Sequence, residues 1–334
     1  MVYLVTGGGG FIGSHLVGAL IQRGDVVRVL DNFSTGRREN LEEIVKRYSL
    51  IVNRDFRWIK SPQRLTNNEH RLTIIEGDIR NLETCRKAME GVSYILHQAA
   101  LPSVPRSISD PITTHEVNVN GTLNLLMSAK EVGVEKFIYA SSSSVYGDSP
   151  TLPKVETMIP RPLSPYAASK LMGEYYCQVF GHVWGVATIC LRYFNIYGPR
   201  QDPTSQYAAV IPKFITALLK GQPPTIYGDG EQSRDFTFIE DCVQANLLAC
   251  KATPLTIGVF NIACGNQVTI NQLYKGLAGL LKTEISPDYT DSRPGDVRHS
   301  LADIHQAKTL LNYQPRFAIQ EGLQRTVMHY QPSS

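Results

Sequence analysis

A glycine-rich loop between an apolar run and a helix-like segment constrains this chain more than any other feature. The run at 1–6 has the composition of a buried strand, and 14–24 is an amphipathic segment that a glycine closes. Between them Gly7, Gly10 and Gly13 have a G-x-x-G-x-x-G spacing. Glycines permit a tight turn, a close approach of backbone N–H groups to an anion, and packing of the helix on the strand. The stretch therefore predicts a strand, a phosphate-binding turn and a helix in succession.

The same alternation of strand and helix continues along the chain. Compact apolar runs of strand length lie at 25–31, 71–78, 92–100, 134–141, 186–193 and 258–264. Helix-like segments separate the earlier runs, and one of them, 81–92, opens with an Asn that can cap it. Strands that alternate with helices predict an α/β fold with a doubly wound, Rossmann-type parallel sheet and right-handed crossovers.

Pro and Gly become frequent from about residue 197, and the alternation weakens there. We expect a Rossmann domain at 1–196 with a returning segment at about 238–264, and a smaller mixed C-terminal domain made of 197–237 and 265–334. Residues 45–71 carry seven Lys/Arg against two acidic residues between the second and third strands. We interpret this stretch as a solvated surface insertion, with a lid or an oligomer contact as the alternative.

Composition narrows the classes of partner. The net charge is +3 and the basic residues are scattered, so we expect no nucleic-acid partner and favour a small phosphorylated ligand. The six cysteines have no Cys-x-x-Cys or zinc-type spacing, which predicts buried side chains in a reducing compartment and no metal. The opening apolar run is too short for a signal or a membrane span, and no later run reaches about 18 apolar residues. We therefore expect a cytoplasmic protein with no membrane partner.

A carboxylate at the end of the second strand identifies the expected cofactor. Asp31 follows the glycine loop by about 20 residues, where a carboxylate accepts both ribose hydroxyls of NAD and repels a 2′-phosphate. Arg37 and Arg38 lie nearby and keep NADP as the alternative. No Gly-Lys-Ser/Thr follows the loop, so an ATP-type P-loop is excluded. Asp78 ends the third strand and has two interpretations, an adenine contact or a cap of the next helix.

The stretch SPYAASK at 164–170 places a phenol, Tyr166, one helical turn before an ammonium, Lys170. Without a cofactor loop the pair would be an ordinary surface pair. Beside NAD, the charges of Lys170 and of oxidised nicotinamide are expected to lower the phenol pKa toward neutrality and make it a general base. Ser142, Ser143 and Ser144 follow the fifth strand, where they can hold a sugar hydroxyl beside the phenol and relay its proton; a flexible loop is the alternative.

Five motifs occur in one order: GxxGxxG, HQAA, SSSSVYG, YxxxK and LRYFNIYGP. Together they resemble the extended short-chain dehydrogenase/reductase family across nearly the whole chain, and within it the UDP-sugar 4-epimerases. The resemblance implies Tyr166 as the base, Lys170 as its electrostatic partner, and Ser142 and Ser144 as the hydroxyls on the sugar O4. It also implies a tightly bound NAD that is not consumed, and a homodimer formed by a helix that begins near 114 and the helix of Tyr166.

The resemblance also implies a fuller set of contacts. The cofactor residues it implies, besides the three loop glycines, Tyr166 and Lys170, are Phe11, Ile12, Asp31, Asn32, Phe33, Ser34, Thr35, Gly36, Asp78, Ile79, Gln98, Ala99, Ala100, Pro102 and Tyr193. The substrate residues, besides the three serines and Tyr166, are Asn195, Ala209, Val210, Thr225, Tyr227, Arg234, Arg293, Asp296 and Ser300. Arg234 and Arg293 are expected on the diphosphate.

The serine loop and one later position predict the reaction and its substrate. Related dehydratases carry an Asp-Glu pair in this loop, and three serines here favour reversible oxidation and reduction at one carbon through a transient 4-keto sugar. In the family, the position of Ser300 lies near the sugar C2 substituent, and a small side chain leaves room for an N-acetyl group. The sequence therefore predicts interconversion of UDP-N-acetylglucosamine and UDP-N-acetylgalactosamine, with UDP-glucose and UDP-galactose left open. A UDP-glucuronate 4-epimerase, a dehydrogenase that releases NADH, and a non-catalytic NAD sensor are the alternatives.

Overall fold

The computed structural model describes residues 1–48, 71–203, 209–253, 258–292 and 297–331. Its internal contacts group the chain into two compact units. The first unit comprises Met1–Val145, Pro162–Arg192 and Val243–Phe260, and the second unit comprises Tyr146–Arg161, Tyr193–Cys242 and Asn261–Ser334. The predicted domain at 1–196 with a returning segment at about 238–264 differs from this grouping at 146–161, at 193–196 and at both ends of the returning segment. Residues 146–161 belong to the second unit, where backbone hydrogen bonds join Lys154 to Leu301 and to Asp303.

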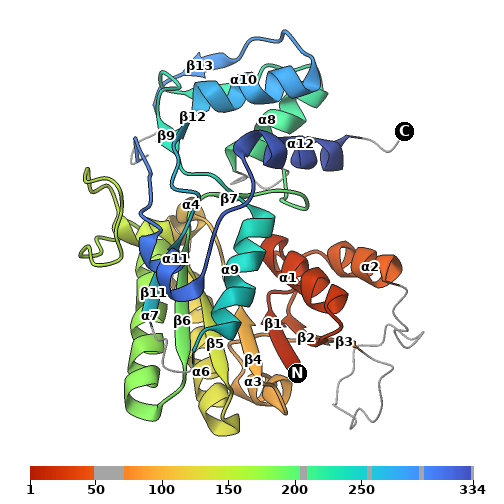
Figure 1. Ribbon diagram of the computed structural model, residues 1–334, viewed down its shortest axis with the longest axis vertical. Helices are drawn as coiled ribbons and strands as arrows, with labels where there is room; N and C mark the ends of the chain where they lie inside the picture. Colours follow the sequence, from red (N-terminus) through yellow and green to blue (C-terminus); the bar gives the residue numbers. More distant parts are fainter. Residues whose placement is uncertain (49–70, 204–208, 254–257, 293–296, 332–334) are drawn as a thin grey trace. The chain divides into compact units, whose positions relative to one another are not determined.

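The first unit is built on a seven-stranded sheet (Figure 1), which confirms the predicted doubly wound α/β fold. Its strands are β1 (Val2–Thr6), β2 (Val26–Asp31), β3 (Leu72–Glu76), β4 (Tyr94–His97), β5 (Lys136–Ser142), β6 (Thr188–Tyr193) and β11 (Gly258–Ile262). They lie in the order β11-β6-β5-β4-β1-β2-β3, and the β3–β2, β2–β1, β1–β4 and β4–β5 pairs are parallel. Strand order reverses next to β1, and ligands of such sheets bind at this switch point, beyond the carboxyl ends of the strands.

Helices complete the first unit, and their ends follow local sequence signals. They are α1 (Phe11–Gln22), α2 (Arg38–Arg47), α3 (Leu82–Met89), α4 (Val104–Ser109), α5 (Pro111–His115), a π-helix (Glu116–Asn120), α6 (Gly121–Val132), α7 (Pro165–Trp184) and α9 (Ile239–Lys251), the first turn of which belongs to the second unit. Asn81 caps α3, as predicted, and Ser164 caps α7 with Pro165 as its first residue.

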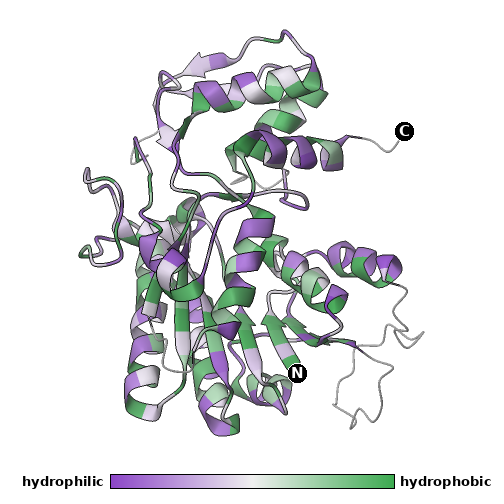
Figure 2. Ribbon diagram, viewed as in Figure 1, coloured by the Kyte–Doolittle hydropathy of each residue, from purple (hydrophilic) through white to green (hydrophobic). Residues whose placement is uncertain are grey.

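One hydrophobic core cluster of the first unit lies between the sheet and the layer of α3, α6 and α7. Side chains such as Leu4, Leu125, Phe137 and Phe180 are almost fully buried there. The sheet strands are correspondingly apolar in Figure 2. A strand that is apolar on both faces is typical of a parallel sheet with helices on both sides. Polar groups that bind a ligand are therefore expected beyond the strand ends.

The second unit contains short strands and helices, in agreement with the weaker alternation of its sequence. Its elements are β7 (Ile196–Tyr197), α8 (Val210–Leu219), β8 (Thr225–Tyr227), β9 (Ser233–Arg234), β10 (Thr237–Phe238), β12 (Val268–Thr269), α10 (Ile270–Leu281), β13 (Asp288–Thr290), α11 (His305–Leu311) and α12 (Ile319–Tyr330). The strands form the parallel pairs β7–β10 and β8–β13 and the antiparallel pair β9–β12.

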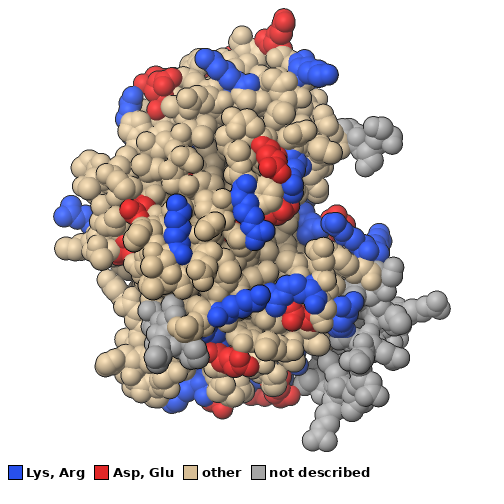
Figure 3. All heavy atoms as spheres, in the orientation of Figure 1, with Lys and Arg blue, Asp and Glu red and all other residues tan. Residues whose placement is uncertain are grey.

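The surface is mixed in charge. Lys and Arg alternate with Asp and Glu over the face drawn in Figure 3, as expected for a chain with a net charge of +3. Within the described ranges, no helix is long and apolar enough to cross a membrane. The cysteines are free thiols, of which five are buried and Cys264 is half-buried. Most of the predicted insertion at 45–71 lies outside the described residues.

Candidate active site

The glycine loop connects β1 to α1 and has no room for side chains. Gly7 has a φ of +69°, and a Cβ on Gly13 would lie 2.0 Å from the Gly7 carbonyl oxygen. Gly10 precedes α1, whose first turn, with Phe11 and Ile12 half-buried, has no acidic residue and no side-chain cap. The N-terminal N–H groups of a helix and its dipole favour an anion. The loop therefore fits the pyrophosphate of a dinucleotide.

Asp31 ends β2 as a buried carboxylate, 7% exposed. Its two oxygens accept backbone N–H bonds from Gly9 and Phe33, each at 2.8 Å. Burial raises the pKa of Asp31, and the two backbone bonds oppose the rise. A carboxylate has about four acceptor positions, so both oxygens can still accept hydroxyl donors. This environment fits a ribose diol and disfavours a phosphate.

The loop after β2, residues 32–36, folds back on the glycine loop. The Arg37 N–H donates to the Gly9 carbonyl oxygen at 2.9 Å, and Asn40 Nδ2 donates to the same oxygen at 2.8 Å. A Cβ on Gly36 would lie 2.9 Å from Asp31 Oδ2. The predicted cofactor residues of this loop thus surround the carboxylate.

The partners of Arg38 and Asp78 bear on two open questions, NADP as the alternative cofactor and the role of Asp78. Arg38 forms an ion pair with Glu76 at 2.8 Å. Asp78 pairs with Arg80 at 2.7 Å and accepts a hydrogen bond from Asn32 at 2.9 Å. The hydrogen bonds from Arg80 lower the pKa of Asp78 to about 2. The next helix has its own asparagine cap, so Asp78 does not cap it, and an adenine contact stays a prediction.

The segment after β4, residues 98–102, is fixed by the π-helix. Asn118 Oδ1 accepts the Leu101 N–H at 2.8 Å, and its Nδ2 donates to the Leu101 carbonyl oxygen at 3.2 Å. The same Nδ2 donates to Ser169 Oγ at 3.0 Å, on the helix of Tyr166. Such π-helical turns frequently occur at functional sites. Ile79, another predicted cofactor residue, packs its side chain in the core, so a cofactor contact there would use its backbone.

Tyr166 and Lys170 lie together on α7. Lys170 is 5% exposed, and its ammonium donates to the Ala140 carbonyl oxygen on β5 at 2.8 Å. The Lys170 Nζ lies 5.9 Å from the centre of the Tyr166 ring. Helical spacing therefore brings a buried ammonium beside a phenol, as the sequence predicted from the i, i+4 pattern.

The serines lie where β5 ends, next to this pair. The Ser142 hydroxyl forms a hydrogen bond with the Tyr166 phenol, and its Oγ accepts the Ser144 N–H at 3.2 Å. Ser144 Oγ is buried and has no partner among the described residues. A buried hydroxyl without a partner costs about 1–3 kcal/mol, which a hydroxyl of a bound ligand would offset. Ser143 begins the 3₁₀ turn Ser143–Tyr146 that carries this group.

The predicted lowering of the Tyr166 pKa combines the charge of Lys170 with that of oxidised nicotinamide, and the groups of the chain alone act on this pKa in opposing directions. Burial raises the pKa of Tyr166, and the hydrogen bond with Ser142 opposes the rise. Burial also lowers the pKa of Lys170 to about 8, against the opposing charge of Glu174. The ammonium bonds a carbonyl oxygen rather than the phenol, so desolvation dominates at Tyr166. The positive charge of oxidised nicotinamide acts in the lowering direction, and its effect stays a prediction.

The second unit contains a cavity of about 280 Å³. Six of the predicted substrate residues line it: Asn195, Ala209, Val210, Thr225, Tyr227 and Arg234. The remaining lining is mostly apolar and includes Ile211, Phe214, Ile226, Phe236 and Ile270. A concave, mainly apolar surface with a few polar groups is typical of a small-molecule site. Because Arg234 contributes a cation to this lining, the cavity can take a small ligand that carries an anionic group.

Arg234 is held by backbone oxygens, whereas the remaining predicted substrate residues do not line the cavity or lie outside the described residues. Arg234 Nη1 donates to the carbonyl oxygens of Ser233 and Arg298, at 2.9 and 3.1 Å, which orients its guanidinium. The Ser300 N–H donates to the same Ser233 oxygen at 3.1 Å, but Ser300 does not itself line the cavity. Arg293 and Asp296 lie outside the described residues. The cofactor residue Tyr193 is buried at the end of β6.

Sequence reasoning missed several buried polar residues of the first unit. Asn118, Glu174 and Arg192 are each almost fully buried and form specific side-chain bonds. A signal for Glu174 was present, because it continues the i, i+4 series of Tyr166 and Lys170 on one helix face. No local signal marked Arg192, which lies in an otherwise apolar strand.

A dinucleotide turn, a ribose-binding carboxylate and a Tyr-Lys pair beside serines occur together in short-chain dehydrogenase/reductase enzymes, and the first unit has this arrangement. Residues 3–263 match the NAD dependent epimerase/dehydratase family. The chain belongs to that family. It is an enzyme with NAD as its cofactor, and the glycine loop and Asp31 are the groups that fit the dinucleotide.

Relatives and solved structures agree over nearly the whole chain. The chain is 40% identical, with a TM-score of 0.87, to a structure of UDP-N-acetylglucosamine 4-epimerase from Methanobrevibacter ruminantium M1 in complex with UDP-N-acetylmuramic acid, covering 98% of this chain and 97% of that one. It is 36% identical to UDP-glucose 4-epimerase of Mycolicibacterium smegmatis over 99% of both chains. A UDP-glucuronic acid 4-epimerase from Bacillus cereus, in complex with UDP-glucuronic acid and NAD, is 33% identical with a TM-score of 0.85 and 98% coverage of both chains.

Proposed function

We propose that this chain, an NAD-dependent nucleotide-sugar 4-epimerase and hence an isomerase, interconverts UDP-N-acetylglucosamine and UDP-N-acetylgalactosamine. The observation that carries the substrate assignment is the small residue at position 300, whose backbone N–H donates to the Ser233 carbonyl oxygen that also accepts from Arg234. A relative of this specificity is 40% identical over nearly the whole chain, which supports the proposal. Relatives that act on UDP-glucose and UDP-glucuronate make those sugars the competing candidates.

The first unit supplies the proton chemistry. Tyr166 takes the proton of the C4 hydroxyl, and the Ser142 hydroxyl donates to the phenol oxygen while it carries negative charge. Ser144 offers its unpartnered hydroxyl to the sugar oxygen. Lys170, fixed on the Ala140 carbonyl oxygen, keeps a positive charge near the phenol. NAD, held by the glycine loop and Asp31, would supply the hydride acceptor and donor for oxidation and reduction at the sugar carbon.

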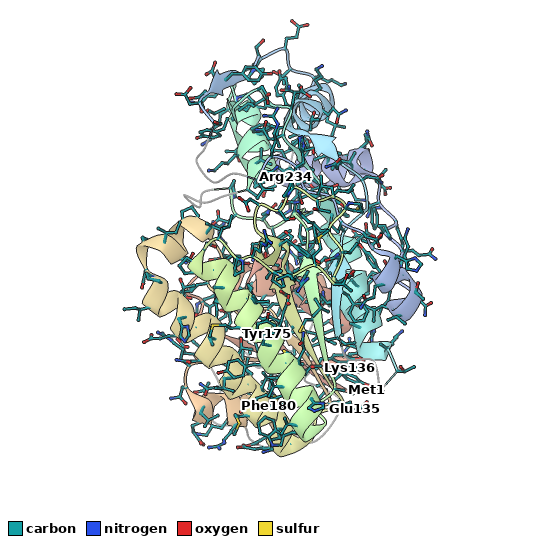
Figure 4. The ribbon with its side chains drawn as sticks, turned by 90° about the vertical axis from the view of Figure 1, so that its left-hand side faces the viewer. Met1, Glu135, Lys136, Tyr175, Phe180 and Arg234 are labelled. Atoms are coloured by element: carbon teal, nitrogen blue, oxygen red, sulfur yellow. The ribbon has the colours of Figure 1, made fainter. Side chains whose placement is uncertain are left out.

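The second unit binds the nucleotide portion of the substrate. Its cavity takes the UDP portion, with Arg234 toward the diphosphate and Tyr227 toward the uracil. Arg293 and Asp296 are proposed on the diphosphate and the uridine ribose. Figure 4 labels Arg234 among the short elements of this unit.

A substrate panel tests the assignment. The untreated enzyme, without added NAD, is assayed on UDP-N-acetylglucosamine, UDP-glucose and UDP-glucuronate, and then as the Ser300→Tyr and Ser300→Ala variants. We expect Ser300→Tyr to reduce kcat/KM for the N-acetylated sugar about 10- to 200-fold, because a bulky ring occupies the space of the acetyl group. Ser300→Ala should keep that activity. Undiminished turnover of the N-acetylated sugar by Ser300→Tyr would contradict the assignment.

We also propose a homodimer through α5, α6 and α7. The outer face of α7 exposes Met172, Tyr175, Val179 and Val183 at helical spacing, and Tyr175 lies on this face in Figure 4. Tyr175→Glu should produce a monomer in sedimentation velocity, because it buries a charge in the interface. Met328→Glu, at an exposed apolar position on α12, is the control and should stay dimeric.

A further inference from the structure

A buried ion pair lies one helical turn beyond Lys170. Glu174 is 1% exposed and Arg192 is 3% exposed. The Arg192 guanidinium donates to both carboxylate oxygens of Glu174, at 2.8 Å from Nε and 2.7 Å from Nη2. Apolar residues of similar size often serve stability equally well, so a pair of this kind is weak evidence for a purely stabilising role. Its place in the site therefore indicates a task beyond stability.

Glu174 fastens α7 to β5 next to the reacting groups. The Ser141 hydroxyl donates to Glu174 Oε1. Ser141 lies between Ala140, whose carbonyl oxygen accepts the ammonium of Lys170, and Ser142, which bonds the phenol. Three consecutive residues of β5 thus bind three successive groups on one face of α7. A shift of the carboxylate would change the spacing at the phenol as well.

The two elements are in close contact at this level. A Cβ on Gly173 would lie 2.2 Å from the Tyr139 hydroxyl oxygen. That hydroxyl donates to the Lys170 carbonyl oxygen at 3.4 Å, and the Lys170 Nζ lies 5.2 Å from the centre of the Tyr139 ring. Lys170 is therefore enclosed, and its charge depends on nearby protein groups rather than on water.

The neighbouring strands of the sheet and α7 itself contribute titratable or charged groups around Lys170. These groups are His97 on β4, Tyr139 on β5, Cys190 and Arg192 on β6, and Tyr166, Glu174 and Cys177 on α7. Burial lowers the pKa of His97 to about 3 and raises those of Tyr139 and Cys190, so these three are uncharged near pH 7. Within this group of residues, Glu174 is the anion that favours a charged Lys170.

We propose that Glu174, held by Arg192 and Ser141, is a positioning residue for the reaction. It keeps Lys170 charged and fixes α7 on β5, so that the phenol of Tyr166 stays on Ser142 within the field of the ammonium. The inference rests on the proposed function only for the role of Tyr166 as the base. Glu174 touches neither substrate nor cofactor, and it acts through Lys170.

The test measures the phenol directly in NAD-loaded protein. The chain has 16 tyrosines, so the ultraviolet titration of the Tyr166→Phe variant is subtracted to isolate this phenol. In Glu174→Gln, and in Glu174→Gln combined with Arg192→Met, Lys170 loses its anion and deprotonates at lower pH. We expect the Tyr166 phenol to titrate about one pH unit higher in both. At neutral pH, kcat should fall about 10- to 100-fold, with KM changed less than about threefold.

Two further variants keep the proposal falsifiable. Asp241→Asn alters another buried carboxylate, which accepts backbone bonds from Arg316 and Phe317, and should lower thermal stability without moving the phenol titration. Ser141→Ala keeps the ion pair and removes the bond from β5. It should raise the phenol titration by a smaller amount and reduce kcat about 3- to 10-fold. If the Glu174 variants do not fold, Ser141→Ala decides the question.

If the phenol titration is unchanged in the Glu174 variants, the proposal is overturned and the ion pair is a packing feature. If the Glu174 variants do not fold, the same conclusion follows from an unchanged titration in Ser141→Ala. The titration does not depend on which UDP-sugar is the substrate. If the unaltered protein turns over none of the UDP-sugars but the titration shifts as expected, the proposed function fails and the positioning role stands. Normal turnover with an unmoved titration means that the proposed function stands and the positioning role fails.

Discussion

The helix that carries Tyr166 and the cavity of the second unit hold their polar groups in different ways. α7 is one helix of 20 residues whose turns fix the spacing of Tyr166 and Lys170 before any tertiary contact forms. The cavity is lined by residues that extend from Asn195 to Ile270, on short strands, a helix and loops. Its shape therefore exists only after distant segments have packed.

The difference predicts how each region responds to mutation. Groups on a rigid element act on the reaction step, because a small displacement there disturbs proton transfer. Groups around a cavity built from many segments act on affinity, which is shared among several contacts. Substitutions on α7 should reduce kcat, and substitutions in the cavity should raise KM.

The largest effect is expected at the phenol. Tyr166→Phe removes the proton acceptor and preserves the ring, so kcat should fall about 100- to 10,000-fold while NAD content and UDP-sugar binding persist. Steady-state kinetics and calorimetric titration with UDP-sugar measure the two quantities. A non-catalytic NAD sensor would be unaffected by this change, and a variant that lost both binding and turnover would place Tyr166 in the fold rather than in the chemistry.

The cavity should give the next largest effect, on affinity. Arg234→Met keeps an unbranched, flexible side chain and removes its charge, so KM for the UDP-sugar should rise about 10- to 100-fold with kcat within about threefold. Arg298→Met is the matched control, because the side chain of Arg298 pairs with Asp229 at the exposed surface. Equal losses in the two variants would show that the effect is one of general surface charge.

A smaller effect is expected where α7 meets β5. Gly173→Ala places a Cβ 2.2 Å from the Tyr139 hydroxyl oxygen, so it should lower the free energy of unfolding by about 1–3 kcal/mol and reduce kcat. Gly279→Ala on α10 is the control, because its Cβ would meet no atom within 4 Å. Helix propensity alone should make that variant slightly more stable. Denaturant unfolding of both variants separates packing from propensity.

The strand and helix pattern of the first unit was predictable because each element carries its own signal. Asn81 caps a helix and Gly7 adopts a positive φ, and both features follow from the residue type at that position. The Tyr166 and Lys170 pair needed only helical periodicity. The bonding of Lys170 to Ala140 was not predictable, because it depends on how far α7 lies from β5.

The polar network behind the site was harder to predict because its members come from separate strands and helices. In the sequence, Arg192 is a single charged residue in an apolar strand. Only the packed structure shows that it forms an ion pair with Glu174. The rise that burial causes in the Tyr166 pKa was not predictable either, since burial cannot be inferred from a motif. Motifs predict which groups are present, and packing decides their charge.

The smallest effect is expected from pH, because one buried group in each unit should change the free energy of unfolding in opposite directions as pH falls. His97 is buried in the first unit between the hydroxyls of Thr6 and Thr122, at 2.7 and 2.9 Å, and burial lowers its pKa from 6.5 to about 3. Its contribution is complete above pH 6.5 and is lost as pH falls toward 3. In the second unit, burial raises the pKa of Asp235 from 3.8 to about 6, so ionisation there costs stability that is regained as pH falls from 6 to 4.

Each group contributes a slope of about 1.4 kcal/mol per pH unit at most, and the two slopes oppose each other between pH 6 and 4. His97→Gln, which can accept from one threonine and donate to the other, should therefore become relatively more stable as pH falls through this range. Asp235→Asn should become relatively less stable. Denaturant unfolding at pH 6, 5 and 4 measures both slopes. Near pH 5, folding releases a proton from His97 and takes up a proton at Asp235. If the stability of both variants relative to the unaltered protein changed with pH in the same direction, other groups would govern the acid response.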